Sequence, residues 1–260
     1  MLTIVVPMAG RGSRFADAGF ALPKPLIAVR GVPMIELVIA NLTPSCPHRF
    51  VFLCLEEHLA TYDVEARLRH VTRECAIVPV SGVTQGAACT VLLAKEYIDG
   101  SDPLMIANSD QWVAIDIDSY LESMRHDACD GLIMTMTASD PKWSFVRTAP
   151  NGCVMEVAEK RAISTEATVG IYNFARGADF VASAEDMIAR DERVNGEFYV
   201  APAYNGLIAA GKRIRIHNIG AEGRGMYGLG IPADLRLFEQ LPVCDQAVEN
   251  ARQSQCSRAA

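Results

Sequence analysis

Short apolar runs alternate with amphipathic segments through the first half of the chain, and this alternation limits the fold more than any other feature. Runs typical of strands buried on both faces occur at Leu2–Pro7, Arg49–Leu55, Ala76–Val80 and Leu104–Ala107. Segments with helical patterns lie between and after them, at Met34–Leu42, Glu57–Arg69, Gly86–Tyr97 and Asp118–His126. Strands that alternate with helices form a mainly parallel sheet with helices on both faces. The first half therefore predicts a doubly wound α/β domain.

The second half has strands at closer spacing, which predicts a mixed sheet. Short strand patterns separated by turns occur at Leu132–Thr137, Phe145–Thr148, Val154–Val157 and Thr168–Phe174. Further elements are expected as helices at Ala178–Arg190, Phe198–Ala210 and Ala233–Gln240, with a strand at Arg213–Asn218. No linker or repeat interrupts the chain. We therefore expect one domain over residues 1–244 and a polar C-terminal tail over residues 245–260.

The charge balance excludes some partners and poses a question about others. The 260 residues include 24 Lys and Arg against 31 Asp and Glu, a formal net charge of −7. A nucleic-acid partner is not expected, because a phosphate backbone requires a basic face. No apolar run reaches the length of a membrane span, so no membrane partner is expected either. The eight cysteines form no CxxC pair, and reduced, buried cysteines imply the cytoplasm. A small anionic substrate would need local positive charge.

The loop after the first strand can supply that charge. Gly10 and Gly12 allow the backbone to approach a ligand closely, and their N–H groups can face phosphate oxygens. A dinucleotide-binding motif would need a third glycine where Phe15 stands, and a P-loop would need a Gly-Lys-Ser/Thr sequence that is absent. A structural turn is the alternative. We prefer a phosphate site because Lys24 lies between two prolines, whose fixed backbone directs its side chain.

Polar residues follow two later strands. Gln85 and Gly86 come after the third strand, and Gln85 carries an amide that can both donate and accept hydrogen bonds at a base edge. Asn108 and Asp110 follow the fourth strand, at the sheet edge where ligands bind in such folds. A helix N-terminus and an Asx turn are the structural alternatives for these two segments.

Taken in order, these segments resemble the signature of the sugar-1-phosphate nucleotidylyltransferase family, in a short, capsule-associated type. The resemblance runs from Leu2 to Phe238 and rests on the glycine-rich loop with Arg14 and on Pro23-Lys24-Pro25. It implies a Rossmann-like, GT-A-type domain whose mixed, mainly parallel sheet is flanked by helices. It also implies an Mg²⁺-dependent enzyme that joins an NTP to a phosphorylated substrate and releases pyrophosphate.

The resemblance also assigns roles to residues of this chain. Arg14 would hold the leaving pyrophosphate, Lys24 the α-phosphate, and Asp110 the Mg²⁺. The nucleotide would contact Ala9, Gly10, Gly12, Gln85, Gly86 and Asn108. The second substrate would contact Glu159, Lys160 and Gly170. Similarity to the capsule-associated subgroup favours CTP among the nucleotides.

One position departs from the family pattern, and several alternatives stay open. Gly228 stands where many members carry a second metal-binding aspartate. Asp116 and Asp118 could instead hold a metal in a GT-A glycosyltransferase that consumes a nucleotide sugar, although helix capping is the expected role. A non-catalytic nucleotide-binding homologue is a further alternative. The acceptor is expected to be a sugar 1-phosphate, with phosphocholine or a phospho-amino acid derivative as alternatives, and a homo-oligomer is compatible with the sequence.

Overall fold

Four parallel strands form one half of the central sheet, as the alternation in the sequence predicts. The computed structural model describes residues 1–259, and these strands are β1 (Leu2–Pro7), β4 (His48–Leu55), β5 (Cys75–Val80) and β6 (Leu104–Ala107). They lie side by side in the order β5-β4-β1-β6. Val5 of β1 pairs with Val51 of β4 on one side and with Ile106 of β6 on the other. The carboxyl ends of these strands therefore meet at one edge of the sheet.

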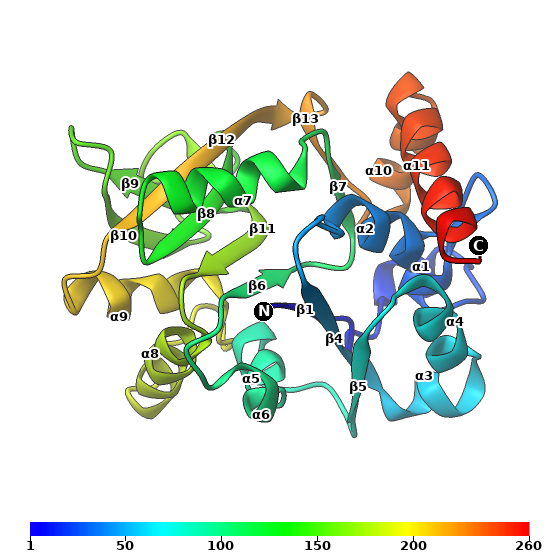
Figure 1. Cartoon of the computed structure of the whole chain (residues 1–260), viewed down its shortest axis with the longest axis horizontal. Helices are drawn as coiled ribbons and strands as arrows, with labels where there is room; N and C mark the ends of the chain where they lie inside the picture. Colours follow the sequence, from blue (N-terminus) through cyan, green and yellow to red (C-terminus); the bar gives the residue numbers. More distant parts are fainter. Residues whose placement is uncertain (260) are drawn as a thin grey trace.

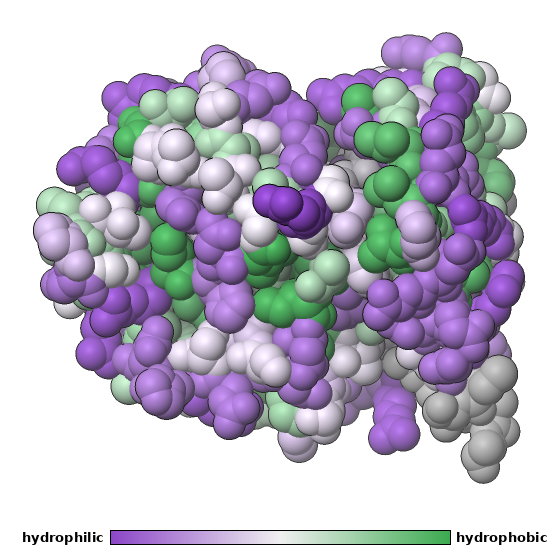
Figure 2. All heavy atoms as spheres, turned by 90° about the horizontal axis from the view of Figure 1, so that it is seen from above, coloured by the Kyte–Doolittle hydropathy of each residue, from purple (hydrophilic) through white to green (hydrophobic). Residues whose placement is uncertain are grey.

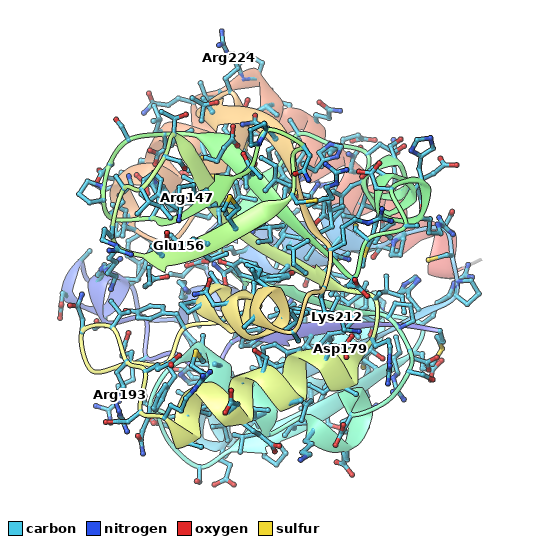
Figure 3. The ribbon with its side chains drawn as sticks, turned by 90° about the vertical axis from the view of Figure 1, so that its left-hand side faces the viewer. Arg147, Glu156, Asp179, Arg193, Lys212 and Arg224 are labelled. Atoms are coloured by element: carbon cyan, nitrogen blue, oxygen red, sulfur yellow. The ribbon has the colours of Figure 1, made fainter. Side chains whose placement is uncertain are left out.

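The remaining strands make the sheet mixed. They are β7 (Gln111–Val113), β8 (Gly131–Thr137), β9 (Ser144–Thr148), β10 (Val154–Glu159), β11 (Glu166–Phe174), β12 (Ile214–Glu222) and β13 (Gly225–Gly228). Strand β11 is antiparallel to both β6 and β8, while β12 is parallel to β8. The hairpin of β9 and β10 places Arg147 beside Glu156 (Figure 3), with 2.6 Å between Arg147 Nη2 and Glu156 Oε2. The predicted doubly wound, mixed sheet is confirmed.

Helices cover both faces of the sheet (Figure 1). On one face lie α2 (Met34–Leu42), α3 (Glu56–Thr61), α4 (Val64–Val71) and α7 (Ile117–His126). On the other lie α5 (Ala87–Leu92), α6 (Lys95–Ile98), α8 (Gly177–Ala189) and α9 (Tyr204–Ala209). Ile4 and Val5 are both fully buried but belong to different core clusters, one on each face. This double burial explains why β1 is a continuous apolar run.

Three predicted helices are shorter than expected or broken. The helix predicted at Glu57–Arg69 is two helices, because Tyr62 adopts an extended backbone. Helix α3 buries none of its residues, whereas α4 buries Val64, Leu68 and Val71, so the break turns the apolar face of α4 toward the core. The helix predicted at Gly86–Tyr97 divides into α5 and α6. The helix predicted at Phe198–Ala210 begins only at the 3₁₀ turn η2 (Ala201–Ala203) and continues as α9.

The C-terminal segment is a helix and not a separate tail. Helix α11 (Pro242–Ala259) packs against α2, and it buries Cys244, Ala247, Val248 and Ala251. These residues recur every three or four positions, which is the spacing of one helix face. The segment expected as a polar tail, residues 245–260, is thus helical over residues 245–259, and its narrow apolar stripe lies within a sequence that is polar on average.

Replacing Ala247 by aspartate tests whether α11 is part of the folded domain. Ala247 has no exposed surface, so the carboxylate would be buried without a partner. We expect a loss of about 3 kcal/mol or more in the free energy of unfolding, measured by urea denaturation. The matched control is Gln246→Asp, at an exposed position on the same helix, which should unfold like the wild type. Equal stability of the two variants would contradict the packing of α11.

The structure also shows how hydrophilic residues and cysteines are distributed over the molecule. Figure 2 shows hydrophilic residues over most of one face of the molecule, with smaller hydrophobic areas between them. Within the described residues, no helix is long and apolar enough to cross a bilayer. The seven cysteines that the structure describes are all unpaired, and three of them are buried.

Candidate active site

Two adjoining cavities lie where the parallel strands end. The first, of about 300 Å³, is lined by the loop after β1, by residues 83–90 and by the residues that follow β6. The second, of about 240 Å³, is lined by residues of β9, β10 and β11 and by the segment before η2. Ala87, Asn108 and Tyr199 line both cavities. Two small ligands bound in these cavities would therefore lie next to each other.

An ion pair between Lys24 and Asp110 lies in the first cavity. The Lys24 Nζ donates to Asp110 Oδ2 at 2.8 Å, and the two side chains are 21% and 27% exposed. Lys24 begins the short 3₁₀ helix η1 (Lys24–Leu26) directly after Pro23, whereas Asp110 follows β6. Gly12 has a φ of 62°, and a Cβ there would lie 3.1 Å from the Lys24 Cβ. The prolines and Gly12 thus let the lysine reach the acid across the sheet edge.

The loop after β1 contributes backbone to the first cavity, while its arginine lies outside. Ala9 and Gly10 line the cavity. Arg14 lies on the short helix α1 (Ser13–Asp17), is exposed, and is not among the residues that line either cavity. It lies close enough to Asp234 for its charge to lower the pKa of that carboxyl, although burial is the larger effect and raises it. Lys24 is therefore the basic residue of this loop region that reaches the cavity.

Gly86 forms the opposite wall, and a second segment of the chain fixes its position. The backbone N of Phe198 donates to the carbonyl of Gln85 at 2.9 Å, and the N of Ala88 donates to the carbonyl of Phe198 at 3.0 Å. Gly86 has a φ of 133°, and a Cβ there would lie 2.5 Å from the backbone N of Phe198. The side chain of Gln85 is exposed and does not line the cavity, whereas Thr84 does.

Glu159, Lys160 and Gly170, which were expected to contact the second substrate, all line the second cavity. The hydroxyl of Ser144 donates to the carboxylate of Glu159, and burial raises the pKa of Glu159. Lys160 has a φ of 52°, and its Nζ donates to the Tyr199 hydroxyl at 2.5 Å. These contacts place a carboxyl group and an ammonium group on the same cavity wall.

Gly170 brings β11 close to the end of β6. Its φ is 79°, its carbonyl accepts from the backbone N of Asn108 at 2.9 Å, and a Cβ there would lie 2.9 Å from Gln111 Oε1 and closer still to Asn108 Nδ2. A glycine is thus required by the close approach of the two amide side chains.

Sequence reasoning missed two residues of the site. Glu197 directly precedes the helix expected at Phe198–Ala210, but it lies before η2 and lines the first cavity. Tyr199 was not considered, although it lines both cavities. Asn195 and Gly196 both have positive φ, so Asn-Gly was the available signal for a turn rather than a helix.

Asp116 and Asp118, the alternative metal ligands considered from the sequence, have structural roles. Asp116 caps helix α7 and accepts from the backbone N of Asp118 at 3.1 Å, while Asp118 accepts from the N of Ser45 at 2.9 Å. Among residues 1–259, no group of three or more His, Cys, Asp or Glu side chains is arranged to hold a metal ion. The expected capping role is confirmed for Asp116, whereas Asp118 lies in the first turn of α7 and holds the backbone of Ser45.

Gly228 stands where many members of the family carry a second metal-binding aspartate. In this structure it lies beside Asp234, an acidic residue of another element. A Cβ on Gly228 would lie 3.4 Å from Asp234 Oδ2, on helix α10 (Pro232–Glu239). A Cβ on Gly230 would lie 2.8 Å from Asp110 Oδ2. Asp110 thus packs so closely against Gly230 that a side chain there would collide with its carboxylate, whereas a side chain at Gly228 would be in ordinary contact with Asp234.

The fold and the two cavities define a class of proteins: α/β proteins with two adjoining ligand cavities where the parallel strands end. The model of the family described as "Nucleotidyl transferase" matches residues 4–198. The chain belongs to this family, and the nucleotidyltransferase class expected from the sequence is confirmed.

Individual relatives agree with this membership. The bifunctional protein GlmU of Thermotoga maritima is 27% identical over 210 residues, which cover 77% of this chain and 43% of that protein, so the chain spans less than half the length of this relative. A nucleoside-diphosphate-sugar pyrophosphorylase structure from Vibrio cholerae RC9 is 28% identical, with a TM-score of 0.76 over 92% of this chain and 100% of the other. An inositol-1-phosphate CTP transferase structure from T. maritima shares the fold, with a TM-score of 0.73 at 14% identity and 95% coverage of both chains.

Proposed function

We propose that this protein transfers a nucleotidyl group from an NTP to the phosphate of a small phosphorylated acceptor and releases pyrophosphate. The observation that carries the proposal is the placement of the Lys24–Asp110 pair and of Lys160 in two cavities that share a wall. An acceptor phosphate held by Lys160 would face an α-phosphate held by Lys24. Since the acceptor phosphate is itself the nucleophile, the reaction needs positioning and charge neutralisation more than a general base.

On the nucleotide side, the chain supplies backbone, an ammonium group and a carboxylate. We assign Ala9, Gly10 and Gly86 to contacts with the nucleotide, and Lys24 to the charge that grows on the α-phosphate in the transition state. Gln85 would reach the base only with its exposed side chain turned inward. Arg14, outside the cavity, would contact the pyrophosphate end of the nucleotide.

The donor chemistry fits a magnesium ion at Asp110. Its carboxylate already binds a cation in this structure, the ammonium of Lys24 at 2.8 Å, and it is 27% exposed where it lines the first cavity. Mg²⁺ prefers carboxylate and phosphate oxygens and keeps several waters, so one aspartate can suffice. When bound, Mg²⁺ would neutralise charge on the nucleotide phosphates.

The acceptor cavity favours a sugar 1-phosphate over phosphocholine. A quaternary ammonium group is recognised by open aromatic faces. Three aromatic residues line this cavity, and one of them, Tyr172, is only 7% exposed. The other two, Trp143 and Tyr199, each already have a lysine ammonium at 4.7 Å from the ring centroid, from Lys142 and Lys160. A second cation would be repelled there, whereas the hydroxyls of a sugar can donate to Glu159.

A matrix of substrates tests the proposed function. CTP, UTP, GTP and dTTP would each be combined with glucose 1-phosphate, phosphocholine and O-phosphoserine in the presence of Mg²⁺, and pyrophosphate would be measured. We expect the highest rate with CTP and the sugar phosphate, and none with phosphocholine. Release of nucleoside diphosphate from a nucleotide sugar without pyrophosphate formation would identify a glycosyltransferase instead. Tight NTP binding without turnover across the matrix would identify a non-catalytic homologue.

A further inference from the structure

Tyr199 is one of the three residues that line both cavities, and it also binds the lysine of the second cavity. Its hydroxyl accepts a hydrogen bond from Lys160 Nζ at 2.5 Å. Lys160 reaches it from the other side of the second cavity, directly after the end of β10. The backbone N of Lys160 donates to the carbonyl of Trp143 at 3.0 Å, which holds the residue in its left-handed conformation. The Lys160 side chain is thus fixed at its backbone by Trp143 and at its ammonium group by Tyr199.

The position of Tyr199 is set by its neighbour in the chain. Phe198 is 1% exposed and packs against Ala88 and Met187, and its backbone makes hydrogen bonds to Gln85 and Ala88. Tyr199 therefore follows a residue that is bound to the segment around Gly86, which lines the first cavity. The backbone from which the Tyr199 ring projects is thus anchored.

The charges around Lys160 keep it protonated. The hydrogen bond to Tyr199 raises the pKa of Lys160, and the carboxylates of Glu159 and Glu197 raise it further. Burial, followed by a hydrogen bond to Glu197, raises the pKa of Tyr199, so the phenol stays neutral and can accept from the ammonium. An ammonium group has three N–H donors, so the bond to Tyr199 leaves two for a ligand.

We propose that Tyr199 is a positioning residue, which holds the ammonium of Lys160 in place for the phosphate of the acceptor. This inference rests on the proposed function. A free lysine side chain loses conformational freedom when a ligand fixes it. Because Tyr199 already fixes Lys160 in the empty cavity, binding of the acceptor phosphate does not bear that cost.

Tyr199→Phe removes the hydroxyl and keeps the ring. We expect the KM of the acceptor to rise about 10-fold, which is the effect of one hydrogen bond to a charged group, while kcat and the KM of the NTP stay within about twofold. In a Lys160→Ala background the same substitution should have no further effect, because the partner is gone. Tyr62→Phe, away from both cavities, is the matched control.

A binding measurement separates this inference from the proposed function. Trp143 lines the second cavity and is one of only two tryptophans in the chain, so its fluorescence can report binding of inorganic phosphate. We expect phosphate to bind about 10-fold more weakly to Tyr199→Phe than to the wild type. Absence of turnover in the wild type would overturn the proposed function alone. Unchanged phosphate affinity, or an equal rise in both KM values with a lower melting temperature, would overturn the role of Tyr199.

Discussion

Replacing Lys24 by methionine is expected to lower the rate of pyrophosphate formation by about 100- to 1,000-fold, the range seen when one group that stabilises transition-state charge is removed. Methionine keeps most of the length of the side chain but not its charge. Because Lys24 and Asp110 are both partly exposed, the remaining carboxylate can be solvated, and the domain should stay folded. Single-turnover rates and a thermal melt would measure the two effects separately.

Asp110→Asn is expected to lower the rate by a comparable factor, since it removes the negative charge of the carboxylate that we propose as the Mg²⁺ ligand. Its Mg²⁺ affinity, measured by titration calorimetry with the nucleotide present, should also fall. The matched control for Lys24→Met is Lys95→Met, which removes an exposed lysine that pairs with Glu185 of α8. Turnover within a factor of two of the wild type in Lys24→Met would rule out the role proposed for this lysine.

Gly86→Ala is expected to disturb stability and both cavities at once. A Cβ at this position would meet the backbone of Phe198, which cannot turn away as a flexible side chain can, and the φ of 133° is unfavourable for alanine. We expect a loss of about 2 kcal/mol, equivalent to a fall of roughly 4–8 °C in Tm. Displacement of Phe198 would also move Tyr199, so the KM values of both the NTP and the acceptor should rise.

Gly82→Ala provides the comparison within the same segment. A Cβ on Gly82 would have no neighbour within 4 Å, so this variant should match the wild type in both Tm and KM. If the two alanine variants behave alike, the contact between Gly86 and Phe198 does not control the site.

The sequence was most informative where function depends on local chemistry. The apolar run of β1, the two glycines after it and the prolines around Lys24 act over a few residues, so their pattern indicated a phosphate-binding loop directly. Asp110 could be predicted because it follows a buried strand, and parallel strands end at one edge. The role of Arg14 was implied by the family resemblance, but the structure places this residue on α1, exposed and outside both cavities.

The sequence could not indicate the residues that depend on contacts between distant segments. Glu197 and Tyr199 follow an Asn-Gly turn with no motif of their own, and they enter the site because Phe198 pairs with Gln85 across more than a hundred residues. Helix α11 likewise joins the domain only because α2 offers an apolar face to its narrow stripe.

The sequence by itself determined the family, the alternating α/β architecture and the local placement of Lys24, Asp110 and Lys160. Only the tertiary structure decided that Lys24 pairs with Asp110, that Lys160 contacts Tyr199, and that the two cavities share a wall. The physical reason is that periodicity and turn chemistry are set by neighbouring residues. Distances between side chains on different strands are set instead by strand order and register, which arise from packing of the whole sheet.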